Sequence, residues 1–335
     1  MQVSMKLTKV KQIIIIMLLT WVNFAAIALQ DEEAPIDQAA AETKTESQKS
    51  ANVTSESSNS TSQKAPSPNK VDIPIPTPKS LTLQHKEDLK HYLPADKVQP
   101  LLAGPDDYIT LVTKNTSVNN KGVAILLPDW QQGVTNPKGL NFLRKQLPLQ
   151  GWTTISIQPT SKPVNYPSTA LEVSEQQQEN KAIIDNYENK LSTMMNAVIA
   201  KANEHPGIVI IIAQGNHGAM LINLLHQGTE QPKIAQPPNA LILLSSYVLT
   251  SNELLNEVNT AFAQKVASSE YPVLDLYLRN DNPIVLDKAQ QRLSLSKKEM
   301  KVYYRQRQLI NGAMGYYPEQ ELLTQINSWL RSMGW

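Results

Sequence analysis

The chain has 335 residues, of which 41% are hydrophobic, and its 31 basic and 30 acidic side chains give a formal net charge of +1. This near balance argues against a general nucleic-acid-binding protein, because neutralising phosphates requires a basic surface. The sequence contains no cysteine. Disulfides, a thiol nucleophile and zinc or iron–sulfur sites built on cysteine are therefore excluded.

The N-terminal end of the chain has the features of a secretory signal peptide. Its basic start contains Lys6, Lys9 and Lys11. An apolar run follows over residues 13–27, and Ala26–Ala28 has the small-x-small pattern of a cleavage site. We expect a signal peptide over residues 1–28, cut near Ala28, and a periplasmic or secreted protein without a membrane span after signal removal. The alternative is an uncleaved N-terminal anchor.

Residues 29–80 have a different composition, in which Glu, Ser, Thr, Gln, Ala and Asn dominate. Prolines gather toward the end of this segment, at Pro66, Pro68, Pro74, Pro76 and Pro78. Such a segment buries too little apolar surface to offset chain entropy, so we expect a disordered linker with a stiffer, polyproline-like end. A tether between the export signal and a folded domain is the simplest interpretation, and a tail that binds peptidoglycan or a partner is the alternative.

Residues 81–335 have the length of one large α/β domain. We expect a short charged helix over residues 86–93, followed by strands that alternate with helices. The predicted strands are residues 108–113, 122–127, 152–157, 208–213, 240–244, 273–277 and 301–304. The predicted helices among and after these strands are residues 139–147, 182–202, the segment after Gly218, and 319–332. Buried apolar strands in this alternation favour a mostly parallel sheet covered by helices on both faces, which is a three-layer α/β sandwich.

The most informative stretch joins the strand over residues 208–213 to the helix after it. An apolar, β-branched run meets a tight polar turn, Gln214–Gly218, and an apolar helical pattern begins at once. Strand, sharp turn and helix is the plan of a nucleophile elbow. Ligands of parallel sheets lie beyond the carboxyl ends of the strands, so this turn and the other loops at that edge are the candidate site.

Five stretches carry a resemblance to a known fold. They are Gly122–Asp129, Leu143 with Gly151-Trp152, Gln214–Ala219, Pro272–Tyr277 and Tyr304–Gln306. In these stretches the domain resembles the α/β-hydrolase fold. More narrowly, it is similar to an uncharacterised family of exported bacterial α/β-hydrolase-like proteins that is defined only as a domain of unknown function.

The resemblance implies a nucleophile, a histidine base and a carboxylate, and the first two are missing from their usual places. Against G-x-S-x-G, either Gly215 or Asn216 falls at the nucleophile position, the second with Gly218 as the closing glycine. Glycine would hold the turn without strain, and Asn216 is most simply a helix N-cap. The loop over residues 310–317 has Gly315 where the resemblance places the histidine.

Three residues are weak catalytic candidates. His217 is a relocated base or metal ligand, or simply a residue that hydrogen-bonds backbone at a helix start. Asp281 lies where these folds often keep a carboxylate, and an Asx-type turn before Pro283 is the simpler interpretation. Ser245 ends a strand, where a serine is usually a capping residue.

Asp129, Trp130 and Gln131 are candidate cleft or ligand-binding residues. They follow the strand over residues 122–127, where hydrolases place part of the oxyanion hole. The loop either forms a cleft wall with an aromatic platform, or its tryptophan covers the sheet edge.

Two functions follow from these features. The first is a non-catalytic binding or scaffolding protein of the cell envelope, with a small-molecule or envelope ligand. The second is a hydrolase of esters, amides or acylated glycans with a rearranged site, in which His217 activates water or Ser245 and Asp281 or Asp129 supports it. We expect no cofactor, no metal and no nucleic-acid partner.

Overall fold

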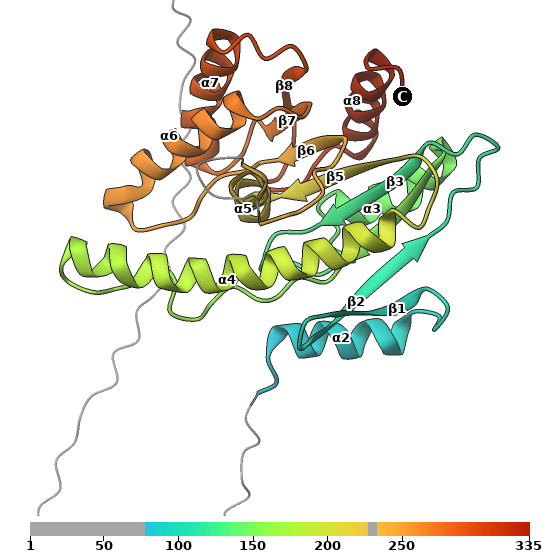
Figure 1. Ribbon diagram of the computed structural model, residues 1–335, viewed down its shortest axis with the longest axis horizontal. Helices are drawn as coiled ribbons and strands as arrows, with labels where there is room; N and C mark the ends of the chain where they lie inside the picture. The colour runs from blue at the N-terminus through green and yellow to red at the C-terminus, as the bar shows by residue number, and fades with distance from the viewer. Residues whose placement is uncertain (1–77, 227–232) are drawn as a thin grey trace, which may run out of the picture. The chain divides into compact units, whose positions relative to one another are not determined.

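A computed structural model of the protein describes residues 78–226 and 233–335 (Figure 1). All of these residues belong to one compact unit, Pro74–Trp335. The predicted signal peptide, its cleavage site and nearly all of the predicted linker lie outside the described residues. Within the described ranges, no helix is both long enough and apolar enough to cross a membrane.

Eight strands form a single mixed sheet. They are β1 (Val98–Ala103), β2 (Asp106–Thr113), β3 (Gly122–Leu127), β4 (Trp152–Ile157), β5 (Ile208–Gln214), β6 (Ala240–Leu244), β7 (Val273–Leu278) and β8 (Tyr304–Leu309). Their order is β1-β2-β4-β3-β5-β6-β7-β8. β2 pairs antiparallel with β1 and β4, and every other neighbouring pair is parallel.

Helices cover both faces of this sheet. They are α2 (Leu81–Tyr92), α3 (Leu140–Gln146), α4 (Val173–Ala202), α5 (Gly215–Leu225), α6 (Asn252–Ser268), α7 (Pro283–Lys298) and α8 (Glu319–Ser332), with a short 3₁₀ helix, η1 (Leu147–Gln150). Successive strand residues point to opposite faces, so β3 and β5 contribute to two separate cores. One core packs against α4, α5 and α6, and the other packs against α3 and α8 (Figure 1). The predicted three-layer α/β sandwich is confirmed.

Both edges of the sheet differ from the sequence predictions. The strand predicted over residues 301–304 is wrong, because β8 begins at Tyr304 and ends at Leu309. β8 is an edge strand with alternating Arg and Gln residues, so it lacks the apolar run that marks a buried strand. β1 at the other edge was not predicted. It contains Pro100, a residue that sheets tolerate at an edge.

Two helices begin earlier than predicted. α2 begins at Leu81 rather than at residue 86, and the Ser80 side chain caps it by accepting a hydrogen bond from the Leu83 backbone N–H. α4 begins at Val173 rather than at residue 182. The first turns of both helices are mostly exposed, so their sequences lack the apolar periodicity by which a helix is recognised.

The strand order creates a crevice between β3 and β5. From β3 the chain runs to β4 on one side, and it then returns to β5 on the other side of β3. Ligands of open α/β sheets bind at such a switch point, outside the carboxyl ends of the strands. The loop after β3, residues 128–139, and the turn at Gln214-Gly215 therefore form the candidate site.

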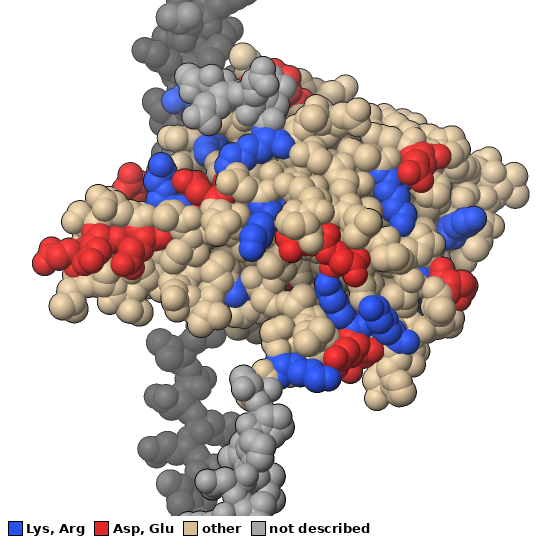
Figure 2. All heavy atoms as spheres, turned by 60° about the horizontal axis from the view of Figure 1, so that its bottom comes forward, with Lys and Arg blue, Asp and Glu red and all other residues tan. Residues whose placement is uncertain are grey.

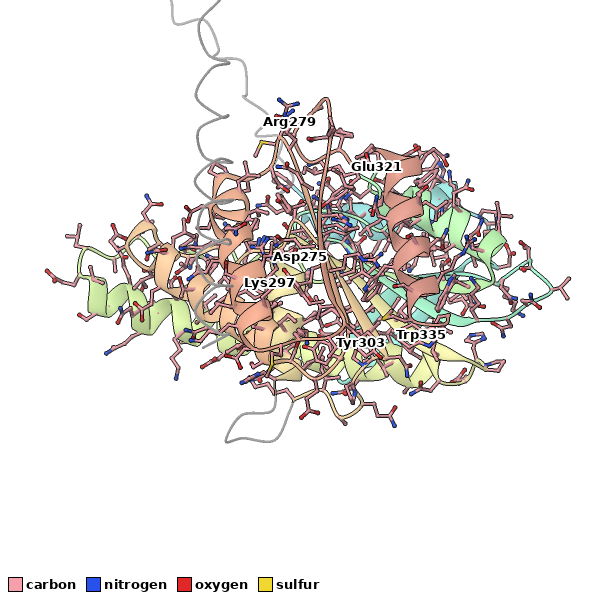
Figure 3. All side chains as sticks on the ribbon, turned by 90° about the horizontal axis from the view of Figure 1, so that it is seen from above. Asp275, Arg279, Lys297, Tyr303, Glu321 and Trp335 are labelled. Atoms are coloured by element: carbon pink, nitrogen blue, oxygen red, sulfur yellow. The ribbon has the colours of Figure 1, made fainter. Side chains whose placement is uncertain are left out.

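A buried ion pair joins β7 to α7 away from that crevice. The Arg292 Nε donates to Asp275 Oδ2 at 2.7 Å, and both side chains are 1% exposed. Tyr304 and Gln306 of β8 donate to the same oxygen at 2.9 and 2.8 Å. Burial is the largest influence on the pKa of Arg292 and lowers it, but the charge and hydrogen bond of Asp275 together with the contact of Tyr304 raise the pKa above its usual value, so the guanidinium stays charged. Figure 3 shows Asp275 in the interior and Arg279 directly beyond the end of the same strand.

Candidate functional site

The turn between β5 and α5 has the backbone of a nucleophile elbow, and Gly215 is its central residue. Gly215 has a φ of +59°, in the left-handed region that favours glycine. It is the first residue of α5, and Gln214 is the N-cap, so the prediction that Asn216 is the N-cap is wrong. The Asn216 Oδ1 instead accepts a hydrogen bond from the Leu249 backbone N–H at 2.7 Å. Gly218 packs one turn later, where an added Cβ would meet the Ser246 hydroxyl.

The Asp129 carboxylate fills the space beside Gly215. A Cβ added to Gly215 would lie 2.5 Å from both Cγ and Oδ2 of Asp129. The Oδ1 atom accepts two backbone hydrogen bonds, from Trp130 N at 2.9 Å and from Asn216 N at 3.1 Å. In an α/β-hydrolase the oxyanion hole consists of an N–H after the nucleophile and an N–H from the loop after the third strand. The N–H groups of Asn216 and Trp130 come from the corresponding positions of this chain, directly after Gly215 and in the loop after β3, and one side chain of the same molecule accepts from both.

Burial makes this carboxylate unusually basic. It raises the pKa of Asp129 from 3.8 to about 6, although the N–H groups of Trp130 and Asn216 and the charge of Lys138 oppose the shift. The group therefore titrates just below neutral pH. Above that pH it places a negative charge beside Gly215.

His217 holds the loop that carries Asp129. The ring is fully buried, with its Nδ1 hydrogen-bonded to the Pro128 carbonyl and its Nε2 2.8 Å from the Tyr187 hydroxyl. A carbonyl can only accept, so Nδ1 carries the proton. Burial lowers the pKa of His217 from 6.5 to about 4, against the effect of the Pro128 hydrogen bond, and the ring is neutral at neutral pH.

Trp130 belongs to the core and does not form a platform. It is 4% exposed and packs edge-on against the rings of Tyr166, Tyr187 and His217, at centroid distances of 5.7, 5.8 and 6.4 Å. Of the two sequence-based interpretations of this loop, the cleft wall with an aromatic platform is wrong for Trp130, because its ring is buried among other rings.

Ser245 and Asp281 lie together at the ends of β6 and β7. The Ser245 hydroxyl donates to Asp281 Oδ2, and the Tyr317 hydroxyl also contacts Ser245 Oγ. Asp281 further accepts the backbone N–H groups of Leu278 at 2.9 Å and Asn282 at 2.7 Å. Ser245 has a φ of +47°, which is uncommon for a residue other than glycine. Asp281 is therefore more than an Asx turn, because it joins the loops after β6 and β7.

The loop between β8 and α8 completes this edge of the site. It supplies Tyr317, a residue that the sequence analysis did not single out, and burial raises its pKa well above the usual value. Gly315 has a φ of +77°, and a Cβ there would lie 3.5 Å from Lys138 Nζ. The only signal for Tyr317 in the sequence was its position two residues before α8. Among the described residues, His217 makes no hydrogen bond to Ser245 or Asp281, so the structure joins only two of the three catalytic candidates.

A cavity of about 490 Å³ lies between α2 and the loop after β3. Gln131 lines it, together with Gln132, Asn136 and Lys138 of the same loop. Asn136 connects the cavity to the elbow, because its Nδ2 lies 3.4 Å from Gln214 Oε1. The described residues contain no group of three or more histidine or carboxylate side chains that could hold a metal ion.

Comparisons with known proteins agree with this architecture. The native esterase Est2 of Thermogutta terrifontis is 11% identical, with 71% of this chain and 92% of the esterase covered and a TM-score of 0.50. Its sarin-phosphonylated form is 12% identical, with 72% and 96% covered and a TM-score of 0.51. An alpha-beta serine hydrolase homologue from Coxiella burnetii is 11% identical, with 72% and 99% covered and a TM-score of 0.46.

Identities this low show the fold alone, and the two esterase structures show that it is the α/β-hydrolase fold. No curated protein matches the chain. The model of the family described as "Protein of unknown function (DUF3530)" matches residues 11–332. That match extends over nearly the whole sequence, so the protein belongs to this family.

Proposed function

We propose that the protein is a non-catalytic binding or scaffolding protein of the cell envelope, which keeps a hydrolase architecture without its serine nucleophile and histidine base. One observation carries the proposal: Asp129 Oδ1 accepts the hydrogen bonds of Asn216 N and Trp130 N. Acyl transfer needs such donors for the oxyanion of the tetrahedral intermediate. An ionised carboxylate already occupies them and repels a second negative charge.

The surroundings of the elbow support the same function. Gly215 occupies the nucleophile position without backbone strain, and Gly315 lies beside the Lys138 amine where a base would stand. His217 is enclosed and neutral, and both of its ring nitrogens have hydrogen-bond partners. A general base needs a free nitrogen within reach of the proton that it removes.

The test is turnover of simple acyl esters by the full chain. We expect that neither the wild type nor Asp129→Ala hydrolyses p-nitrophenyl acetate or butyrate above the uncatalysed rate. We also expect no labelling by a serine-directed fluorophosphonate. Asp129→Ala is the informative variant, because it frees the two N–H donors without adding a nucleophile. Wild-type turnover that disappears in Ser245→Ala would overturn the proposal.

A hydrolase of esters, amides or acylated glycans with a rearranged site is the second candidate, and the geometry of Ser245 favours it. Ser245 follows a strand end and has a left-handed backbone conformation, and its hydroxyl donates to a carboxylate. These features resemble those of an activated nucleophile. Its other partner is the phenol of Tyr317, whose raised pKa makes it a poor base at neutral pH. This candidate predicts fluorophosphonate labelling of Ser245, which Ser245→Ala abolishes.

A location in the periplasm or outside the cell is part of the proposal, and it rests on the basic and apolar N-terminal sequence. We expect the mature protein to begin at Leu29 and to fractionate with soluble envelope proteins. N-terminal sequencing of the mature chain checks this directly. Recovery of Met1 in a membrane pellet would instead support the uncleaved anchor.

A further inference from the structure

We propose that the cavity between α2 and the loop after β3 binds a neutral saccharide. The proposal rests on the proposed function, since it names the ligand class of that binding site. The cavity of about 490 Å³ has the size of a small-molecule site. One wall is α2, with Asp88 and Tyr92, and the other is the loop over residues 131–138. Tyr316, from the loop before α8, also lines it.

Four of the polar side chains that line the cavity are carboxamides. Gln131, Gln132, Asn136 and Gln158 all line it. A carboxamide donates and accepts hydrogen bonds at the same time, which matches the hydroxyl groups of a sugar. Among the described lining residues, Lys138 is the only lysine or arginine and Asp88 is the only carboxylate. The lining therefore has no excess charge that would select an anion or a cation.

Two exposed tyrosines add the apolar contact that a sugar ring needs. Tyr92 is 76% exposed and Tyr316 is 47% exposed, although both rings border the cavity. An aromatic face is apolar, and the C–H faces of pyranose rings pack on such surfaces while their hydroxyls reach polar side chains. The Lys138 amine lies 5.8 Å from the centroid of the Tyr316 ring and helps to fix that ring.

Several of the amides are already oriented by the protein. Gln158 Oε1 accepts the Val134 backbone N–H at 3.1 Å, and Asn136 Oδ1 accepts the Lys138 backbone N–H at 2.9 Å. Gln132 Oε1 accepts from Asn136 Nδ2. Fixed donors and acceptors lower the entropy that ligand binding costs. A lipid or acyl chain could not use the donors and acceptors that these amides still have free, so it fits the cavity poorly.

The test is ligand-observed NMR and calorimetry on the full chain with three neutral probes, which are maltotetraose, cellotetraose and chitotetraose. We expect at least one of them to saturate the protein with a Kd between about 1 μM and about 1 mM. Tyr92→Ala and Gln131→Ala should each weaken that probe about tenfold or more, and Tyr92→Phe should keep most of the affinity. Tyr303→Ala is the matched variant, because Tyr303 is also exposed, at 56%, but does not line the cavity.

No saturation by any of the three probes at about 10 mM would overturn the proposal. Equal weakening by Tyr303→Ala and Tyr92→Ala would overturn it as well, and so would equal or tighter binding of inorganic phosphate. The result is independent of the esterase assay. If the protein binds the sugar and also hydrolyses esters, only the non-catalytic function is refuted. If it neither binds the sugar nor hydrolyses esters, only the sugar site is refuted.

Discussion

At the scale of single residues, Asp129 and His217 determine the state of the elbow. Asp129 accepts the two N–H groups beside Gly215, and His217 holds the Pro128 carbonyl just before it. Asp129 therefore fills the space beside Gly215, and His217 fixes the backbone segment that carries Asp129. Their pKa values shift in opposite directions for the same reason, because burial disfavours the charged form of each.

This pair predicts opposing pH dependences of stability. Folded Asp129 keeps its proton up to a pKa of about 6, so its contribution to the free energy of unfolding falls as pH rises from 4 to 6. Folded His217 loses its proton at a pKa of about 4, against 6.5 when unperturbed, so its contribution rises over nearly the same range. We expect the two effects to offset each other in the wild type.

Removing one member should expose the effect of the other. Relative to the wild type, the stability of Asp129→Asn should rise with pH between 4 and 6, by up to about 1.4 kcal/mol per pH unit. The stability of His217→Gln should fall with pH over the same range. Urea unfolding at a series of pH values measures both slopes. If the free energy of unfolding of both variants changed with pH in parallel with that of the wild type, the pKa shifts of Asp129 and His217 would not be present.

Gly215 gives a second prediction at this scale. Gly215→Ala places a Cβ against the Asp129 carboxylate and forces alanine into a left-handed conformation. We expect a loss of about 2 kcal/mol or more in the free energy of unfolding, of which about 1–2 kcal/mol is backbone strain. The cost should shrink in an Asp129→Ala background, because the clash is then removed.

Gly312→Ala is the matched control for this measurement, because nothing lies within 4 Å of an added Cβ there. We expect that change to stay within about 0.5 kcal/mol of the wild type. Equal costs for Gly215→Ala with and without Asp129 would mean that the carboxylate does not fill the space beside Gly215.

At the scale of elements, the edge of the sheet is held by polar contacts rather than by apolar packing alone. α7 contributes Arg292 to a carboxylate on β7, and β8 adds Tyr304 and Gln306. This cluster attaches an edge strand of polar sequence to the parallel sheet. It also explains why β8 has no apolar run.

We expect Arg292→Met to destabilise the protein by about 3–5 kcal/mol, because it leaves a buried carboxylate without its counter-charge. Chemical denaturation monitored by circular dichroism measures the change. Arg307→Met, on the exposed part of β8, should stay within about 0.5 kcal/mol of the wild type. Similar costs for the two variants would contradict a structural role of the buried pair.

At the scale of the whole molecule, the buried residues of the hydrophobic cores, among the residues that the structure describes, all lie between Leu89 and Leu330. Met333 and Trp335 are partly buried and pack against one of these cores. We therefore expect a chain reduced to residues 81–335 to fold on its own. Its thermal unfolding should be one cooperative transition with a midpoint within a few degrees, about 3 °C, of that of the full chain. Loss of the cooperative transition would place the domain boundary before residue 81.

Surface charge at the scale of the whole molecule is mixed in sign on the face that Figure 2 shows. On the face shown in Figure 2, small groups of basic and acidic side chains are scattered among uncharged residues, which make up most of the surface. The acidic group at its left edge lies at the N-terminal end of α4, as its place in Figure 1 indicates. A mixed surface of this kind fits the near-neutral net charge.

The sequence by itself determined the buried parallel strands and the elbow, because Val123–Leu127 and Ile208–Ile212 are apolar runs that only a covered sheet can bury. Its resemblance to the hydrolase fold predicted Gly215 or Asn216 at the nucleophile position and Gly315 at that of the base. The tertiary structure alone decided what fills the space at Gly215 and which side chains meet Ser245. Those contacts join residues 36 to 87 positions apart in the chain, and no local pattern encodes them. Local periodicity reports which face of an element is buried, whereas a site depends on which loops the strand order brings to one edge.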